Sequence, residues 1–455
     1  MSRSPVRRGA LGAAAVALAL ALNPHIAIAS ESSLEDEPPP ESVEGLRGPL
    51  AEGFRERVRK QTLFPRLAEA LEDAPPFFRD TELHLAPRAY YLRRRNEDNS
   101  RSEAWALGGS LVYRSGRWRD LLSVGAAAYT SQRLLGKQSE GGTRLLERSN
   151  DGYTVLGQAY AQLHWREHAL TLYRQELDLP YVNGQDSRMT PNTFEGFVAQ
   201  GSEGPIDYAA GHLLQIKRRN EDHFVSFSEA AGPASGPHEG LSLLGVRWRL
   251  TENLSVGAVD YWVKDVLNVL YAEVDWHLPL AGELGLRAQA QFTHQKSVGD
   301  DRLTGDAYET WVVGGRLAAS YKSALLSFAF STTDREASIR SPFGSYPGYL
   351  SLMQLDFNQA GEDAFGLAAS YHFGRLGIPQ LSWHVSAVWG EGARDAARNE
   401  LADQRELDLT LDYRFEKGGL RGLWLRLRGS NVHIDGEPRD SNEVRVILNY
   451  DIPIL

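Results

Sequence analysis

From Thr81 to the C-terminus, apolar and polar residues alternate in segments of about ten residues separated by short breaks. In two of the clearest segments the apolar positions are Leu284, Leu286, Ala288, Ala290 and Phe292, and Leu407, Leu409, Leu411, Tyr413 and Phe415. Alternation with a period of two predicts strands with one apolar and one polar face. Strands of soluble proteins average about five or six residues, whereas tilted membrane strands need about nine to eleven. The segment length therefore favours a transmembrane barrel, with lipid on the apolar face and water on the polar face.

The same rule predicts about eighteen strands and an all-β fold, a transmembrane antiparallel up-and-down β-barrel. The strands are centred near residues 83–92, 104–113, 121–131, 153–165, 168–177, 193–201, 206–217, 241–250, 254–262, 267–277, 284–293, 309–320, 323–332, 364–373, 381–389, 405–415, 421–430 and 443–452. After the N-terminus, no segment reaches the roughly 18 apolar residues that a transmembrane helix needs.

The predicted connections fall into two classes that strictly alternate along the chain. Short connections lie at residues 115–117, 166–168, 251–253 and 418–420, and long ones at residues 137–151, 220–239, 295–308, 333–363 and 391–404. Short periplasmic turns on one rim and long extracellular loops on the other are typical of outer-membrane barrels. An even number of strands then places both ends of the barrel in the periplasm.

Aromatic residues near the strand ends are predicted to mark the two membrane interfaces, where Trp and Tyr gather in membrane barrels. These residues are Tyr90, Tyr91, Tyr113, Trp118, Tyr129, Trp165, Tyr173, Trp276, Trp311, Tyr321 and Tyr413. Their positions favour lipid-facing girdles over ordinary strand aromatics.

The first 29 residues have the pattern of a secretory signal peptide. Three arginines precede an apolar stretch at residues 10–22, and residues 27–29 read Ala-Ile-Ala, a typical cleavage site. Residues 30–80 form an acidic, proline-containing extension that we expect in the periplasm, with a short amphipathic helix within residues 53–71. A tether is the simplest role for the extension, and a docking element or a plug in the barrel mouth is the alternative. The barrel itself is assigned to residues 81–455.

Composition disfavours several classes of function. The chain has no cysteine, which removes disulfides and thiolate metal sites. Its net charge is -10, and the predicted signal peptide carries only basic charges, so the remainder is more acidic still and nucleic-acid binding is disfavoured. The twelve histidines show no metal-binding spacing, and there is no Gly-x-Ser-x-Gly elbow. We therefore expect no catalytic residues, no metal, no cofactor and a protein that is not an enzyme.

Several long segments resemble the OprD-type family of outer-membrane carboxylate channels. The matching segments are residues 174–195, which read RQELDLPYVNGQDSRMTPNTFE, and residues 341–362, 371–379, 418–429 and 443–450. The resemblance extends from about residue 76 to the C-terminus and implies an eighteen-strand barrel, monomeric or weakly trimeric. This agrees with the strand count from alternation. Two departures are Gln359, where the family usually has arginine, and Leu455, where many barrels end in phenylalanine.

Parity places a row of arginines on the inward, polar face of consecutive strands. These candidates for the pore wall are Arg88, Arg414, Arg426, Arg428 and Arg445. Strand direction puts Arg414 low, Arg426 near mid-height and the next two higher, which predicts a ladder of guanidinium groups. A guanidinium stays charged and grips a carboxylate with two hydrogen bonds. The resemblance implies the same role, a basic ladder that guides substrate carboxylates.

A lumenal salt-bridge network is the alternative role for these arginines. Glu406, Asp408 and Asp412 share the inward face of one of the same strands, so the arginines would neutralise them. The two roles are compatible, because a guanidinium has more donors than one carboxylate uses.

Two long loops are candidates for narrowing the pore, since a barrel of this size has a wide lumen. The first, at residues 178–192, is predicted to fold inward and to contribute Tyr181, Asn183, Asp186, Ser187 and Arg188. The second, at residues 333–363, contributes Tyr346, Tyr349 and Asp356. The resemblance favours folding inward over an ordinary surface loop. The two aspartates, facing the arginines, would hold an ammonium group and make the pore a filter for zwitterions.

The sequence therefore predicts a porin of the Gram-negative outer membrane for the selective passive diffusion of small carboxylate-bearing solutes. The expected partners are these solutes, outer-membrane lipid and lipopolysaccharide, and the barrel-assembly machinery. Two alternatives stay open: a barrel enzyme such as a lipase or protease, and an adhesin or structural barrel with a closed lumen. Single-channel conductance separates the last from a porin, because a sealed barrel gives no current steps.

Overall fold

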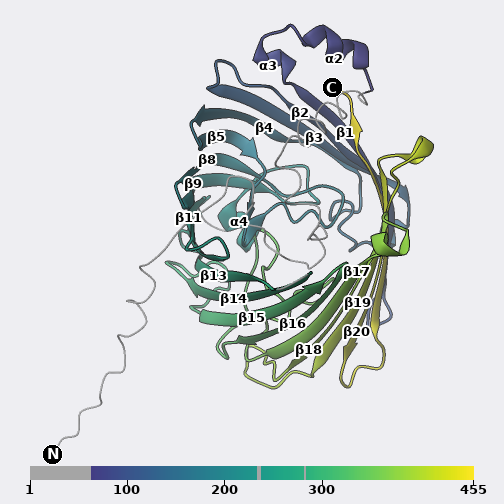
Figure 1. Cartoon of the computed structure of the whole chain (residues 1–455). Helices are drawn as coiled ribbons and strands as arrows, with labels where there is room; N and C mark the ends of the chain where they lie inside the picture. Colours follow the sequence, from purple (N-terminus) through teal and green to yellow (C-terminus); the bar gives the residue numbers. More distant parts are fainter. Residues whose placement is uncertain (1–62, 233–236, 281–282) are drawn as a thin grey trace, which may run out of the picture.

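The structure is a computed structural model that describes residues 63–455 except residues 233–236 and 281–282. The predicted signal peptide and residues 30–62 of the predicted extension lie outside the described residues. Twenty strands form one antiparallel sheet among the described residues, and eighteen of them, of 8 to 14 residues, make up the barrel wall (Figure 1). The predicted fold class, a transmembrane antiparallel barrel of about eighteen strands, is confirmed.

The long strands follow one another around the barrel in chain order. They are β1 (Glu82–Arg95), β2 (Arg101–Arg114), β3 (Leu122–Leu135), β4 (Tyr153–Trp165), β5 (His168–Gln175), β8 (Thr193–Glu203), β9 (Ile206–Lys217), β11 (Leu241–Arg249), β12 (Leu254–Val263), β13 (Leu267–Pro279), β14 (Leu284–Ser297), β15 (Glu309–Tyr321), β16 (Ala324–Thr333), β17 (Asp363–His372), β18 (Leu381–Glu391), β19 (Gln404–Arg414), β20 (Leu423–Ile434) and β21 (Ser441–Tyr450). Short strands are β6 (Asp178–Leu179), β7 (Val182–Asn183), β10 (Val225–Ser226) and β22 (Ile452–Pro453). β21 pairs with β1 along residues 88–95, which closes the sheet. Closure leaves no unpaired edge in the bilayer.

The apolar stripe of the strands faces outward. On β19, Leu407 and Leu409 are 52% and 47% exposed, whereas Glu406 and Asp408 between and beside them are buried inside the barrel. Exposed large apolar side chains occur on strands from β1 to β21. A belt of this kind would be unfavourable in water and is what a bilayer contacts.

Most aromatic residues predicted for the interface girdles have exposed side chains. Those among the exposed large side chains are Trp118, Trp165, Tyr173, Trp276, Trp311 and Tyr321. The prediction is wrong for Tyr90 and Tyr129, which are 1% and 5% exposed and lie inside the barrel. Parity explains the first case, because Tyr90 is two positions from the inward-facing Arg88 and shares its face.

The predicted strict alternation of short and long connections is wrong at three places. On the rim that carries the long loops, residues 96–100 join β1 to β2, residues 264–266 join β12 to β13 and residues 435–440 join β20 to β21. The other connections on this rim are residues 136–152, 176–192, 218–240, 298–308, 334–362 and 392–403. A hairpin needs only a few residues to reverse direction, so the longest connections must serve another purpose.

That purpose is visible inside the barrel, where four long loops pack against the wall. They are the first lumenal loop (residues 176–192), the second lumenal loop (residues 334–362), the loop at residues 136–152, and the described residues of the loop at 218–240, which contains α4 (Phe227–Ala231; Figure 1). Leu145 and Leu146 of the loop at residues 136–152 pack with Tyr90 and Leu92 of β1. The other three loops share an apolar core that includes Leu179, Val182, Phe227, Phe343 and Tyr346 from the loops and Leu213, Leu243, Val259 and Tyr271 from the wall. The inward face is therefore not polar throughout, as alternation predicts, because the loops need an apolar surface to pack on.

Both described ends of the chain lie at the rim that carries the short turns. α2 (Pro65–Leu71) and α3 (Pro76–Arg79) precede β1, and the backbone amide of Leu63 donates to the carbonyl of Pro453 at 2.9 Å. Within residues 53–71, where a helix is predicted, the described part contains α2. Among the described residues, no helix has the length and apolar composition needed to cross a bilayer.

Candidate functional site

The first lumenal loop extends into the lumen and is held there by buried polar contacts. Tyr181 lies in the turn between the paired short strands β6 and β7 of the loop. Its hydroxyl donates to Thr293 Oγ1 on β14 at 2.8 Å. The ammonium of Lys217 at the end of β9 donates to the carbonyl of Pro191 at 2.9 Å. Breaking a buried hydrogen bond leaves an unsatisfied group, at a cost of about 1–3 kcal/mol. The loop is thus attached to two separate parts of the wall.

The tip of the first lumenal loop is clamped to the seam of the barrel by Arg88 on β1. Its two terminal nitrogens bind the two carboxylate oxygens of Asp186 at 2.6 and 2.9 Å. Its Nε donates to Asn449 Oδ1 on β21 at 2.7 Å, and Nη1 also donates to the carbonyl of Arg188 at 2.6 Å. A bidentate guanidinium–carboxylate pair fixes geometry as well as charge. Arg88 therefore joins the loop to the strands that close the sheet.

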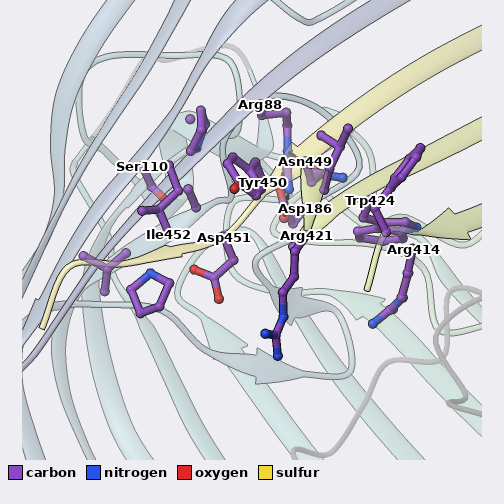
Figure 2. A pocket seen from close by; sticks show the side chains of 18 of the residues that line it. Arg88, Ser110, Asp186, Arg414, Arg421, Trp424, Asn449, Tyr450, Asp451 and Ile452 are labelled. Carbon is purple, nitrogen blue, oxygen red and sulfur yellow. Dashed lines mark hydrogen bonds and ion pairs between the residues drawn. The ribbon is translucent and has the colours of Figure 1, made fainter. Parts of the chain in front are cut away.

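This clamp separates two water-accessible cavities in the lumen. The loop-side cavity has a volume of about 600 Å³ and the turn-side cavity about 1320 Å³. Both are lined by Arg88, Asp186, Trp424 and Asn449. Figure 2 looks into the turn-side cavity, where Arg88, Asp186 and Asn449 lie close together. These side chains therefore lie at the boundary between the two cavities.

The second lumenal loop is fixed to the wall by two carboxylates of β19. Glu406 accepts hydrogen bonds from the backbone amides of Gln354 and Leu355, at 2.9 and 2.8 Å. Asp408 accepts one from the backbone amide of Met353 at 3.0 Å. Consecutive amides pointing at two acidic groups form an anion-binding turn. Glu406 and Asp408 therefore bind backbone amides of the second lumenal loop. The predicted salt-bridge network assigns them arginine partners.

Replacing both carboxylates, in E406Q/D408N, is expected to loosen the second lumenal loop. A hydrogen bond to a charged group contributes about 1.5–3 kcal/mol, and tenfold in an equilibrium corresponds to about 1.4 kcal/mol. Hydrogen exchange of the backbone amides of residues 353–355 should accelerate by at least about tenfold. The control is D440N, which changes the residue directly before β21. The carboxylate of Asp440 contacts Asn431 and His433 and not the second lumenal loop. Unchanged exchange in E406Q/D408N would show that the loop is held by its apolar contacts alone.

The loop-side cavity is strongly basic. Nine arginines line it, namely Arg88, Arg94, Arg144, Arg188, Arg219, Arg316, Arg426, Arg428 and Arg445. The acidic residues that line it are Asp186, Asp356 and Asp408. Because a narrow cleft of one charge sign concentrates ions of the opposite sign, this cavity attracts anions.

The arginines predicted for the ladder occupy successive levels of one wall. Arg428 lies directly opposite Arg445 in the β20–β21 register, and Arg426 is two positions nearer the turns. Arg414 lines the turn-side cavity instead. Trp424 connects the two levels, since the guanidiniums of Arg414 and Arg426 lie 4.9 and 4.5 Å from its ring. The order along the pore matches the heights expected from strand direction.

Several of these arginines also have carboxylate partners. Asp412 Oδ1 accepts from Arg426 Nε at 2.8 Å. Glu443 on β21 is bonded by both Arg94, at 2.5 Å, and Arg445, which is only 2% exposed. Salt bridges of the predicted network are therefore present on the same wall as the arginines predicted for the ladder, and Arg445 is buried within that wall.

Burial affects the ionisation of the arginines that the loops contribute. Desolvation, followed by repulsion from Arg445, lowers the pKa of Arg188 to about 10. Desolvation and repulsion from Arg188 likewise lower the pKa of Arg219. Arg188 remains protonated near neutral pH, because its pKa is still well above it. The guanidiniums thus repel one another in a partly dry site, and an entering anion relieves that repulsion.

The predicted loop residues divide into those that line the loop-side cavity and those that do not. Asp186, Ser187, Arg188, Tyr346, Tyr349 and Asp356 line it. Tyr181 and Asn183 are each 2% exposed and do not. Asn183 Oδ1 instead accepts from the amide and hydroxyl of Ser345, at 3.0 and 2.9 Å, and so joins the two lumenal loops. These two residues therefore hold the lumenal loops in place and do not line the loop-side cavity.

Four arginines of the loop-side cavity are absent from the sequence-based candidates. Arg94 shares the inward face of β1 with Arg88, and Arg316 faces inward on β15, so alternation alone could have identified both. Arg144 and Arg219 belong to loops, where periodicity carries no information. Their position depends on how the loops fold, as in the contact of Arg219 with the hydroxyl of Ser187.

The described residues contain no group of three or more His, Cys, Asp or Glu side chains placed to hold a metal ion. Charged side chains of the wall and of the loops are the binding groups that line the loop-side cavity.

Comparison with known proteins gives a consistent result. The family model described as outer membrane porin, OprD family, matches residues 75–454. Porin D of Pseudomonas aeruginosa is 25% identical over 432 residues, which cover 84% of this chain and 93% of that protein. Among solved structures, OccK9 (OpdG) of Pseudomonas aeruginosa aligns with a TM-score of 0.77 at 23% identity, over 83% of this chain and 100% of that chain. OpdK of the same organism, solved with vanillate, aligns with a TM-score of 0.74 at 22% identity and the same coverage.

Proposed function

The chain belongs to the OprD family of outer membrane porins, channels of the Gram-negative outer membrane, and we propose that it carries small carboxylate-bearing solutes by selective passive diffusion. The observation that carries this proposal is the charge of the loop-side cavity, which nine arginines and three aspartates line. A planar guanidinium matches the geometry of a carboxylate and stays charged at physiological pH. Small organic anions are therefore the solutes that this cavity favours.

The path proposed for the solute runs along the arginine-bearing wall. A carboxylate enters the loop-side cavity, is bound in turn by Arg428 and Arg426, passes the Arg88–Asp186 clamp and leaves along Arg414. Conduction requires each site to be strong enough to admit the ion and weak enough to release it. Partners such as Asp412 weaken the sites, because a solute must compete with a carboxylate already bound to Arg426.

Two relatives support the carboxylate class. The solved structure of OpdK contains vanillate, and that of OccK2 (OpdF) contains glucuronate, both of which are carboxylates. A filter for zwitterions is a narrower form of the proposal. Both oxygens of Asp186 are engaged by Arg88, so Asp356 is the acidic group of the loops that is better placed to receive an ammonium.

The proposal predicts an anion-selective channel. In planar bilayers under a salt gradient, the purified protein is expected to give current steps whose reversal potential corresponds to preference for the anion. The preference should persist from about pH 5 to about pH 8, because guanidiniums do not titrate there. Liposome swelling should be faster with small carboxylates than with their uncharged amides. A barrel without current steps, or with cation preference, would contradict the proposal.

A further inference from the structure

The outer face of the β1–β2 hairpin carries three arginines at the extracellular end of the barrel. Arg95 on β1 lies directly opposite Arg101 on β2, and Arg93 lies on the same face two positions along β1. All three side chains are exposed. They alternate with Arg94, which faces the lumen, so these three point away from the pore. We call them the outer arginine cluster.

The cluster lies where the apolar belt ends. Below it, Tyr91 and Trp105 form an edge-to-face pair with ring centroids 6.3 Å apart, as expected of an interface girdle. Arg93 is ten positions along β1 from Leu83, near the opposite end of the strand. At about 3.3 Å per residue and a tilt of about 40°, this corresponds to a height of about 25 Å, the height of the apolar belt of a membrane barrel. The guanidiniums are thus at the level of the headgroups of the outer leaflet.

The hairpin balances the charges of the cluster only in part. Glu103 lies directly opposite Arg93 in the β1–β2 register and 3.5 Å from Arg101, and the same carboxylate accepts a hydrogen bond from Tyr91 at 2.8 Å. Glu97 and Asp98 lie in the turn between the two strands, where Asp98 accepts a hydrogen bond from the amide of Ser100. Arg95 donates to the neutral side chain of Asn99 at 2.9 Å. On the other side of β1, the residues opposite Arg93 and Arg95 are uncharged, Val444 and Asn442.

Like charges directly opposite in an antiparallel pair destabilise the sheet. The pair of Arg95 and Arg101 is therefore unfavourable without a further anion, because Glu103 contacts Arg101 while Arg95 contacts the neutral side chain of Asn99. We propose that the outer arginine cluster binds the phosphate groups of phosphorylated lipid in the outer leaflet. Arginine binds phosphate through two parallel hydrogen bonds, and basic groups beside a membrane surface attract anionic headgroups. The cluster faces away from the lumen, so this site does not depend on what the pore transports.

Lipid binding by purified protein tests the proposal directly. Wild type and R95Q/R101Q are titrated in detergent with bisphosphorylated lipid A, with the same lipid after dephosphorylation, and with inorganic phosphate, and the complexes are counted by native mass spectrometry. The matched control is R166Q/R405Q, which removes two exposed arginines that are not opposite one another, Arg166 in the turn between β4 and β5 and Arg405 on β19.

We expect R95Q/R101Q to bind the phosphorylated lipid about tenfold more weakly than wild type, and the control within about twofold. All three proteins should bind the dephosphorylated lipid equally. Inorganic phosphate should bind wild type far more weakly than the lipid, because the apolar belt contributes to lipid binding. Equal lipid binding by wild type and R95Q/R101Q would overturn the proposal, and so would inorganic phosphate binding as tightly as the lipid.

Thermal unfolding offers a second readout that does not depend on counting lipids. Without phosphorylated lipid, R95Q/R101Q is expected to unfold at the same temperature as wild type or higher, because the repulsion between two opposed guanidiniums is gone. With phosphorylated lipid, wild type is expected to gain stability by ligand binding and the variant is not. The same shift in both proteins would contradict a phosphate site at the cluster.

Discussion

Replacing Asp186 with alanine is expected to raise the single-channel conductance by about two- to threefold and to weaken discrimination between solutes. The reason is that Asp186 is the side chain by which the first lumenal loop binds Arg88, with contacts at 2.6 and 2.9 Å. Without it, the tip of the loop loses its attachment to the seam and the two cavities merge. The measurement is the conductance of single channels in planar bilayers at fixed salt.

The variant R88A should be measured beside D186A. It also releases the first lumenal loop, but it removes a positive charge from the pore where D186A removes a negative one. Both variants should widen the pore, whereas anion preference should rise in D186A and fall in R88A. The double variant should be no wider than either single one, since both remove the same interaction. D451A is the matched control: Asp451 also lines the turn-side cavity, but its contact is His84 at 3.1 Å. A conductance unchanged in D186A and R88A would show that the clamp does not set the width.

Replacing two arginines of the loop-side cavity, in R426Q/R428Q, is expected to reduce carboxylate flux by about tenfold and to leave neutral sugars within about twofold. Electrostatic concentration of an anion in a charged cleft raises its rate of passage by about 10- to 1000-fold, and the two residues are consecutive steps of the wall. A neutral solute does not experience this field. Liposome swelling with carboxylic acids and their matched amides measures the ratio of carboxylate flux to neutral-solute flux.

Replacing Arg426 has a second effect, which the experiment must separate from the loss of positive charge. Asp412 loses its partner and becomes an uncompensated negative charge in the pore, which itself repels anions. R426Q/R428Q/D412N removes that charge and should recover part of the carboxylate flux. The control R166Q/R405Q removes two exposed arginines that line neither cavity and should leave the ratio of acid flux to amide flux unchanged. An equal fall for acids and amides in R426Q/R428Q would argue for a change of pore width rather than of charge.

The strands and their orientation could be predicted from alternation alone. The rule works because the strands are lipid-exposed on one face, so every second residue must be apolar regardless of what fills the lumen. The same parity assigns Arg94 to the lumen as well as Arg88, and it would have excluded Tyr90 from the interface girdle. Both errors, the omission of Arg94 and the placement of Tyr90 in the girdle, are therefore corrected when the alternation of β1 is followed along the whole strand.

The loops could not be predicted in this way. Asn183 looks like a pore residue in the sequence, yet it is buried between the two lumenal loops, where it binds Ser345. Glu406 looks like a partner for arginine, yet it binds the amides of Gln354 and Leu355. Both depend on contacts between segments more than 50 residues apart in the chain. No local pattern encodes such contacts.

The sequence by itself determined the barrel, its lipid-facing belt and the inward row of arginines, because these follow from a repeat of two residues that the bilayer imposes on every strand. Only the tertiary structure decided where the lumenal loops attach to the wall, which arginines they add to the loop-side cavity and which acidic residues bind the arginines of the wall. The physical reason is that the loops fold against the wall through an apolar core and scattered buried hydrogen bonds, whose partners are brought together only when the sheet closes.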